Sequence, residues 1–146
     1  MSPAALRQYL YEHIPLSKAM QVAAVYVSRE SVVLSAPLAP NINHRQTAFG
    51  GSASALAILS AWSLLHVRLH TEHAGCRVVI QRNTIEYESP IQGEFSARSS
   101  LPHPEQWPSF LRLLSRRGKA RVAVTAVVEY LGRSAAVFSG EFVALK

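Results

Sequence analysis

A chain of 146 residues and 16.0 kDa is the size of one domain, so we expect a single domain over residues 1–146. Hydrophobic residues make up 49% of the chain and charged residues 16%, which excludes intrinsic disorder, and a single cysteine excludes both a disulfide framework and a cysteine-based zinc site. Fifteen lysines and arginines against nine acidic residues, all of them glutamate, give a formal net charge of +6, so an anionic partner has to be considered.

The first part of the chain predicts a helix and a β-hairpin. Apolar residues recur at helical spacing over residues 3–14, and Pro15 ends that pattern. Residues 21–27 and 31–38 are rich in Val, Ala and Leu and are separated by the polar residues 28–30, which is typical of a hairpin. A polar loop follows.

Residues 51–70 predict a long helix that is buried on all sides, because apolar residues occupy every face rather than one stripe. Its most apolar part, residues 53–65, is about 13 residues long, shorter than the roughly 20 that cross a bilayer, and the N-terminus lacks the apolar run of a signal peptide. We therefore expect a cytoplasmic protein with no membrane partner. Because Glu72 is the only carboxylate nearby, we expect no metal on the three histidines at the end of this helix, His66, His70 and His73.

The rest of the chain predicts further strands and a short helix. Extended, largely apolar segments cover residues 77–87, 94–100, 119–131 and 133–145. Residues 105–117 predict a helix that ends at Gly118 and turns three side chains inward, Trp107, Leu111 and Leu114. One buried helix and about six strands without a βαβ rhythm indicate an α+β fold, in which an antiparallel sheet wraps around that helix.

The loop before the buried helix carries a specific motif. Residues 41–51 read Asn-Ile-Asn-His-Arg-Gln-Thr-Ala-Phe-Gly-Gly and are followed by Ser-Ala-Ser-Ala-Leu. This segment, with support from Pro90 and Gly93, resembles the loop and helix start of hot-dog acyl thioesterases, and it is most similar to thioesterase domains of the YiiD carboxy-terminal type. Identity to the motif is confined to residues 41–56, whereas the order of the elements agrees over nearly the whole chain.

The resemblance implies a hot-dog fold and the hydrolysis of acyl thioesters carried by coenzyme A or acyl-carrier protein, without a cofactor or a metal. It also implies a homodimer or a dimer of dimers, because hot-dog sites form between the helix start of one subunit and the sheet of its partner. A catalytically silent module that binds acyl thioesters is the alternative.

The residue types of the loop indicate how such a site would work. Gly50 and Gly51 let a ligand approach backbone N–H groups that the first helical turn leaves unpaired, at the positive end of the helix dipole. Each N–H donated to a developing oxyanion contributes on the order of 3 kcal/mol. We predict Gly51 and the amide of Asn43 as catalytic groups and Gly50, Ser52 and Phe49 as substrate-binding residues. Glycines that merely permit a tight turn are the alternative.

The group that would activate water is left open by the sequence. Hot-dog thioesterases of the phenylacetyl-CoA type carry an acid eight residues after the first glycine of the pair, and that position is Ile58 here. His44 is included among the predicted catalytic residues because it adjoins Asn43 and histidine is the side chain that most often acts as a general base. The alternatives are Glu86 or Glu88 at a strand end, or no base at all.

Positive charge is concentrated between residues 112 and 121, on Arg112, Arg116, Arg117, Lys119 and Arg121. A solvated basic face, a phosphate-binding patch and a nucleic-acid site are the possible interpretations. Aromatic residues are not interleaved with the cluster, as a stacking platform would require, so we expect no nucleic acid. With the resemblance, we predict that phosphates of the substrate's coenzyme A bind Arg116, Arg117, Lys119 and Arg121.

Overall fold

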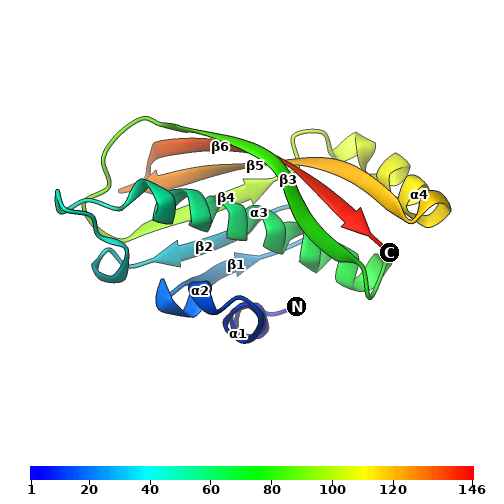
Figure 1. Cartoon of the computed structure of the whole chain (residues 1–146), viewed down its shortest axis with the longest axis horizontal. Helices are drawn as coiled ribbons and strands as arrows, with labels where there is room; N and C mark the ends of the chain where they lie inside the picture. The colour runs from blue at the N-terminus through cyan, green and yellow to red at the C-terminus, as the bar shows by residue number, and fades with distance from the viewer.

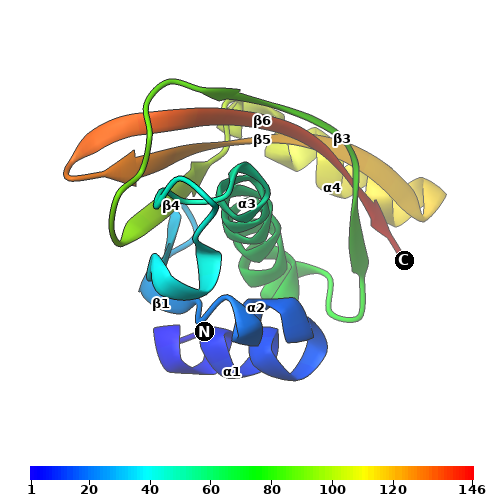
Figure 2. The same cartoon turned by 60° about the vertical axis from the view of Figure 1, so that its left-hand side comes forward.

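Helix α3 (Gly50–Glu72) lies at the centre of the molecule, and one antiparallel sheet curves around it (Figures 1 and 2). The computed structural model describes residues 1–146. The six strands follow the order β1-β2-β4-β5-β6-β3, with the bounds β1 (Ala23–Val27), β2 (Val32–Ala36), β3 (Arg77–Tyr87), β4 (Phe95–Ser100), β5 (Lys119–Tyr130) and β6 (Arg133–Leu145). This arrangement confirms the predicted α+β fold with a sheet wrapped around a long helix.

Strand β3 forms one edge of the sheet although it lies in the middle of the sequence. It pairs antiparallel with β6, from Arg77 opposite Leu145 to Tyr87 opposite Ala136, and its other side has no strand beside it. The chain then returns to the interior of the sheet as β4. The long strand β3 therefore carries the end of its sequence, near Tyr87, to the beginning of α3 (Figure 1).

Two short elements precede the sheet and lie beneath α3 in Figure 2. Helix α1 (Pro3–His13) is capped by Ser2, whose Oγ accepts a hydrogen bond from the Ala5 N–H at 3.1 Å, and it buries Leu6 and Leu10. Pro15 ends the predicted helix but also begins a second one, α2 (Pro15–Ala19). Proline is tolerated in a first helical turn because its missing N–H would have no acceptor there.

The prediction that α3 is buried on every face is only partly right. The helix buries Leu56, Leu64 and Leu65 completely, but one stripe at helical spacing stays partly open to solvent: Gly51, Ala55, Ile58, Trp62, His66 and His70. The helix is also longer than the apolar run suggested. It has 23 residues, and by length and composition alone it could cross a membrane. However, 61% of its most apolar segment is buried inside this fold.

Two buried serines fix α3 against the sheet. The Ser60 hydroxyl lies 2.9 Å from the Val32 carbonyl oxygen and 3.1 Å from that of Ala97, and the Ser99 hydroxyl donates to the Ser60 carbonyl at 2.9 Å. Because β2 and β4 are adjacent, these bonds satisfy polar groups in the core and set the position of the helix across the strands.

Helix α4 (Trp107–Arg117) follows a 3-10 turn, η2 (Pro104–Gln106), and packs at the C-terminal end of α3. The Trp107 Nε1–H donates to Glu72 Oε2 at 2.7 Å. Gly118 ends the helix in the left-handed region with φ 73°, as predicted. The predicted inward residues all contact the core: Trp107 and Leu114 are buried, and Leu111 is partly buried and packs against it. Phe110, which was not predicted, is buried with them. The other helical element is a 3-10 turn, η1 (Ala39–Asn41).

Candidate active site

The first turn of α3 leaves two backbone donors without an acceptor. No side chain caps the helix, and the Phe49 carbonyl accepts the N–H groups of Ser52 at 2.9 Å and Ala53 at 3.1 Å. The N–H groups of Gly50 and Gly51 have no hydrogen-bond acceptor in the chain. Helical N–H groups point out of the N-terminal end, where the helix dipole is positive. This end of α3 is therefore suited to bind a carbonyl oxygen that gains negative charge.

The side chain of Asn43 holds the preceding loop together. Its Oδ1 accepts the N–H groups of Arg45 at 2.8 Å and Thr47 at 3.2 Å, and its amide donates to Thr47 Oγ1 at 2.9 Å. These bonds enclose a tight turn in which Gln46 adopts φ 66°. The geometry thus gives Asn43 a role in shaping the loop, and its amide as a direct oxyanion donor stays a prediction.

Asn41 joins the loop to the body of the protein, a role that the sequence reasoning missed. Its side chain is 2% exposed, and Nδ2 donates to the Met20 carbonyl at 3.0 Å and the Pro37 carbonyl at 2.8 Å. Its own carbonyl accepts the Phe49 N–H at 2.7 Å. Asn41 therefore fixes Phe49, from which α3 begins. The only sign of this role in the sequence was that Asn41 belongs to the same motif.

A cleft of about 360 Å³ opens beside the start of α3, between Gly50 and Ala53 of the helix, Ala48 of the loop and residues 87–91. Tyr87 forms one wall, and its hydroxyl donates to the Gly50 carbonyl at 2.9 Å. A Cβ on Gly50 would lie 3.5 Å from the Tyr87 ring, an ordinary contact. Tyr87 is 37 residues away in sequence and belongs to another element, so no local pattern could have indicated it.

Of the residues considered for activating water, Glu88 lines this cleft. It follows β3 directly, its backbone N–H donates to the Ala135 carbonyl at 2.8 Å, and its Oε1 accepts the Ser134 hydroxyl at 2.5 Å. Glu86 is an exposed residue of β3, and His44 is exposed in the loop turn with no hydrogen-bond partner. Neither lines the cleft.

Phe49 and Ser52 flank the two glycines. The Phe49 side chain is 58% exposed, and its ring occupies the space beside Gly51, where an added Cβ would lie 2.4 Å from ring atom Cε2. Ser52 is half-buried in the first helical turn, and its hydroxyl makes no hydrogen bond. Both residues therefore lie next to the unpaired N–H groups, while their contact with a substrate stays a prediction.

Ile58 belongs to the partly open stripe of α3 and packs against the core. The first carboxylate on this helix is Glu72, in its last turn. Glu72 forms an ion pair with Arg29 and accepts the indole N–H of Trp107, so it is engaged at the far end of the helix. No acid elsewhere on α3 therefore takes the place of the one that phenylacetyl-CoA-type thioesterases carry at the position of Ile58.

The predicted phosphate-binding residues lie far from the glycines of the same chain. Arg116 and Arg117 are in the last turn of α4, and Lys119 and Arg121 follow on β5; all are exposed, and none forms an ion pair. They lie at the C-terminal end of α3, which in Figure 1 is the opposite end of the molecule from the loop. A helix of 23 residues separates the two ends by about 33 Å.

The histidines at the end of α3 do not converge on one point. His73 Nε2 lies 2.8 Å from Ser115 Oγ, whereas His66 packs against Tyr9 and Trp62 at centroid distances of 4.3 and 4.9 Å. No group of at least three His, Cys, Asp or Glu side chains in the chain is arranged to hold a metal ion.

A single antiparallel sheet wrapped around one long helix, with the helix start opening to a cleft, defines a hot-dog protein. The model of the family described as "Putative thioesterase (yiiD_Cterm)" matches residues 3–146, and the chain belongs to this family. Thioester hydrolysis is therefore the class of reaction to which the chain is assigned.

Solved structures share this fold. A protein of unknown function from Chlorobaculum tepidum TLS is 28% identical, with a TM-score of 0.91, and the match covers 99% of this chain and 94% of that one. A "putative thioesterase" from Shewanella oneidensis is 26% identical, with a TM-score of 0.84 and coverage of 99% and 97%. A thioesterase from Haemophilus influenzae shares the fold, with a TM-score of 0.80 at 11% identity and coverage of 100% and 92%.

Proposed function

We propose that this protein hydrolyses acyl thioesters of coenzyme A or acyl-carrier protein at the N-terminus of α3. The observation that carries the proposal is the pair of unpaired N–H groups of Gly50 and Gly51 beside a cleft that also contains a carboxylate, Glu88. The family assignment supports the reaction class, and the carrier and the acyl group are part of the proposal.

In the proposed reaction, the thioester carbonyl oxygen accepts hydrogen bonds from these two N–H groups. A water oxygen attacks the carbonyl carbon, and Glu88 accepts a proton from that water. The oxyanion of the tetrahedral intermediate is stabilised by the N–H groups and the helix dipole. The carbon–sulfur bond then breaks, the thiolate leaves and takes up the proton held by Glu88, and the carboxylic acid is released.

We propose in addition that two copies of the chain pair through β3. This strand has 11 residues and an unpaired edge, and Val79 and Tyr87 on it are 49% and 55% exposed. An open edge of this length is a template for pairing with another strand. A two-fold axis across two antiparallel β3 strands would bring the basic cluster of one copy toward the α3 start of the other. Such a pair is the arrangement in which the cluster could reach the phosphates of coenzyme A.

A catalytically silent module that binds acyl thioesters is the second candidate, and Ile58 is the observation that favours it. The assay that separates the two is release of free thiol from acyl-CoA substrates of increasing chain length. Turnover of at least one substrate by the wild-type protein supports hydrolysis.

The residue that assists the water is tested by matched variants. Glu88→Gln is expected to lower kcat by about 10²-fold or more, whereas Glu86→Gln, which alters an exposed carboxylate outside the cleft, leaves it unchanged. A large loss in His44→Ala instead would assign the role to His44. Binding without turnover, together with turnover gained in Ile58→Asp, would establish the silent module.

A further inference from the structure

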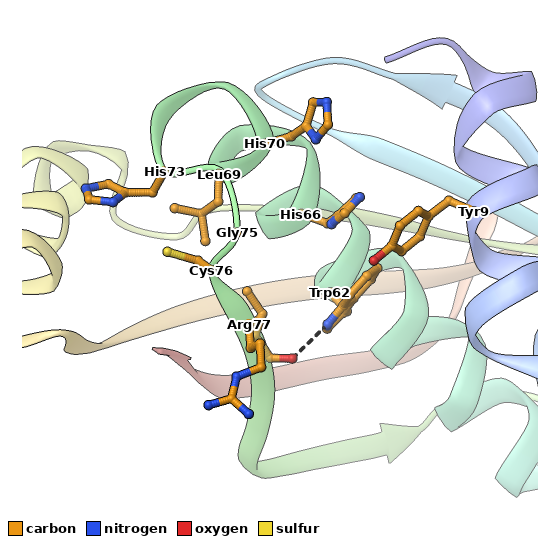
Figure 3. Close-up of a pocket in the computed structure, with 10 residues that line it drawn as sticks. Tyr9, Trp62, His66, Leu69, His70, His73, Gly75, Cys76 and Arg77 are labelled. Carbon is orange, nitrogen blue, oxygen red and sulfur yellow. Dashed lines mark hydrogen bonds between the residues drawn. The ribbon is translucent and has the colours of Figure 1, made fainter. Parts of the chain in front are cut away.

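Strand β3 is tied to α3 near both of its ends by hydrogen bonds between a side chain and a backbone carbonyl. Near the beginning of the strand, the indole N–H of Trp62 on α3 donates to the Val78 carbonyl at 2.9 Å (Figure 3). At the last residue of the strand, the Tyr87 hydroxyl donates to the Gly50 carbonyl at 2.9 Å. Gly50 is the first residue of α3, so the second bond lies where the proposed reaction takes place.

The first turn of α3 has little else to hold it. It begins with two glycines, which have the greatest backbone freedom of any residue, and no side chain caps it, although helix ends tend to fray. The residues just before it are fixed, because the Ala48 N–H donates to the Ile91 carbonyl at 2.8 Å and the Phe49 N–H donates to the Asn41 carbonyl at 2.7 Å. Within the turn itself, the Tyr87 hydroxyl is the one side-chain group that hydrogen-bonds the backbone.

The carbonyl that Tyr87 contacts belongs to the same peptide group as the Gly51 N–H. Electrons are shared across the partial double bond of a peptide group, so a hydrogen bond accepted by the carbonyl makes the N–H a stronger donor, by about 10–30% per bond. The Gly50 N–H shares its own peptide group with the Phe49 carbonyl, which accepts two N–H groups of the first helical turn. The helix therefore polarises the group that carries the Gly50 N–H, and Tyr87 adds a bond from outside the helix to the group that carries the Gly51 N–H.

The Tyr87 ring also restricts the space around this peptide group. A Cβ on Gly50 would lie 3.5 Å from the ring, so the ring is in contact range of the helix start. The backbone of Tyr87 is fixed in the sheet, opposite Ala136 of β6. Pairing of a second copy with β3 would use the backbone edge of the strand, so it leaves this bond within one chain in place.

We propose that Tyr87 is a positioning residue of the thioester site. Its hydroxyl holds the peptide group between Gly50 and Gly51 in one orientation and strengthens the Gly51 N–H as a donor to the oxyanion. The hydroxyl proton stays on Tyr87 throughout, since the effect is one of geometry and electrostatics. This inference rests on the proposed function, because Tyr87 acts on the reaction through the Gly51 N–H.

The variant Tyr87→Phe removes the hydroxyl and keeps the ring. Its kcat for thiol release is expected to fall about two- to fivefold with KM nearly unchanged, because the strengthened N–H matters most when the oxyanion forms. Tyr26→Phe is the matched control and should keep the wild-type kcat. Tyr26 is an exposed tyrosine of β1, at the opposite edge of the sheet, and its hydroxyl makes no hydrogen bond.

Amide NMR shows whether the hydroxyl acts through Gly51. The protein is titrated with an acyl-CoA analogue in which a methylene replaces the thioester sulfur. At saturation, the downfield shift of the Gly51 amide proton is expected to be smaller in Tyr87→Phe than in wild type. The shift of the Gly50 amide proton should equal that of wild type, because its peptide group ends at the Phe49 carbonyl. A general loosening of the helix start would reduce both shifts together.

The outcomes separate this proposal from the proposed function. Wild-type amide signals that do not respond to the bound analogue contradict hydrolysis at the start of α3, and the role of Tyr87 with it. Wild-type signals that respond, with an unchanged Gly51 shift or an unchanged kcat in Tyr87→Phe, overturn the role of Tyr87 alone. Equal reductions of the Gly50 and Gly51 shifts in this variant also overturn it.

Discussion

The variant Asn43→Ala tests whether the Asn43 side chain shapes the loop or acts directly on the substrate. The substitution removes the acceptor of the Arg45 and Thr47 N–H groups and the donor to Thr47 Oγ1. A hydrogen bond contributes about 1 kcal/mol net, and the exposed Arg45 N–H regains water, so we expect the free energy of unfolding to fall by about 2 kcal/mol. For a domain of this size, that corresponds to a decrease in Tm of about 4–8 °C.

Asn43→Asp is the matched variant. A carboxylate can still accept both backbone N–H groups and can accept the Thr47 hydroxyl, so the free energy of unfolding is expected to stay within about 0.5 kcal/mol of wild type. Urea unfolding measures both changes, and thiol release measures kcat on the same samples. An unfolding free energy for Asn43→Ala equal to that of wild type, with kcat reduced about 10²-fold in both variants, would refute the loop-shaping role and favour a direct oxyanion donor.

Three further predictions concern the glycines, His66 and the basic cluster. Gly50→Ala should keep the wild-type Tm, because the new Cβ makes only an ordinary contact with Tyr87 at 3.5 Å. The rate of thiol release should fall, because the methyl group narrows the approach of the substrate to the N–H; a lower Tm instead would show a packing role for Gly50. Because the pKa of His66 is lowered in the folded protein, the unfolded chain binds a proton at this residue more readily, so the free energy of unfolding should decrease as the pH falls below about 6.5. Urea unfolding at pH 7.5 and 5.5 should show a smaller decrease in His66→Gln. Charge reversal at Arg116 and Arg117 should raise KM for acyl-CoA and leave KM for acyl-pantetheine unchanged, whereas equal effects on both substrates would exclude phosphate binding.

Local spacing was enough to predict most of the elements. The apolar run of α3, the alternating segments of the sheet and the left-handed end of α4 at Gly118 each depend on near neighbours in sequence, and the structure confirms them. The omissions are also local in origin. Pro15 can end one helix and begin the next, and the i, i+3 spacing from Trp107 places Phe110 on the buried face beside the predicted Leu111.

Only the part of the site that lies on one continuous segment of the sequence was predictable. The motif indicated the loop and the two glycines, and their N–H groups are indeed unpaired. Tyr87 and Glu88 enter the cleft because β3 pairs with β6 at the sheet edge, an arrangement that no local pattern encodes. For the same reason, composition could not show that the basic cluster lies at the opposite end of α3 or that the stripe from Gly51 to His70 stays partly open.

The proposed pair of subunits has its own measurement. Light scattering at micromolar concentration should return a particle of at least twice the 16.0 kDa of the chain, because the unpaired edge of β3 would be covered by a second copy. A particle of 16.0 kDa would contradict the pairing.

The central claim is that the N–H groups of Gly50 and Gly51 receive the substrate's carbonyl oxygen. The most direct test follows the amide signals of these two residues by NMR during titration with an acyl-CoA analogue in which a methylene replaces the thioester sulfur, so that the carbonyl remains but cannot be hydrolysed. Binding of the carbonyl oxygen by these N–H groups predicts that both amide protons shift downfield and saturate together, as the hydrogen bonds form. Saturable binding of the analogue with both amide signals unchanged would contradict it.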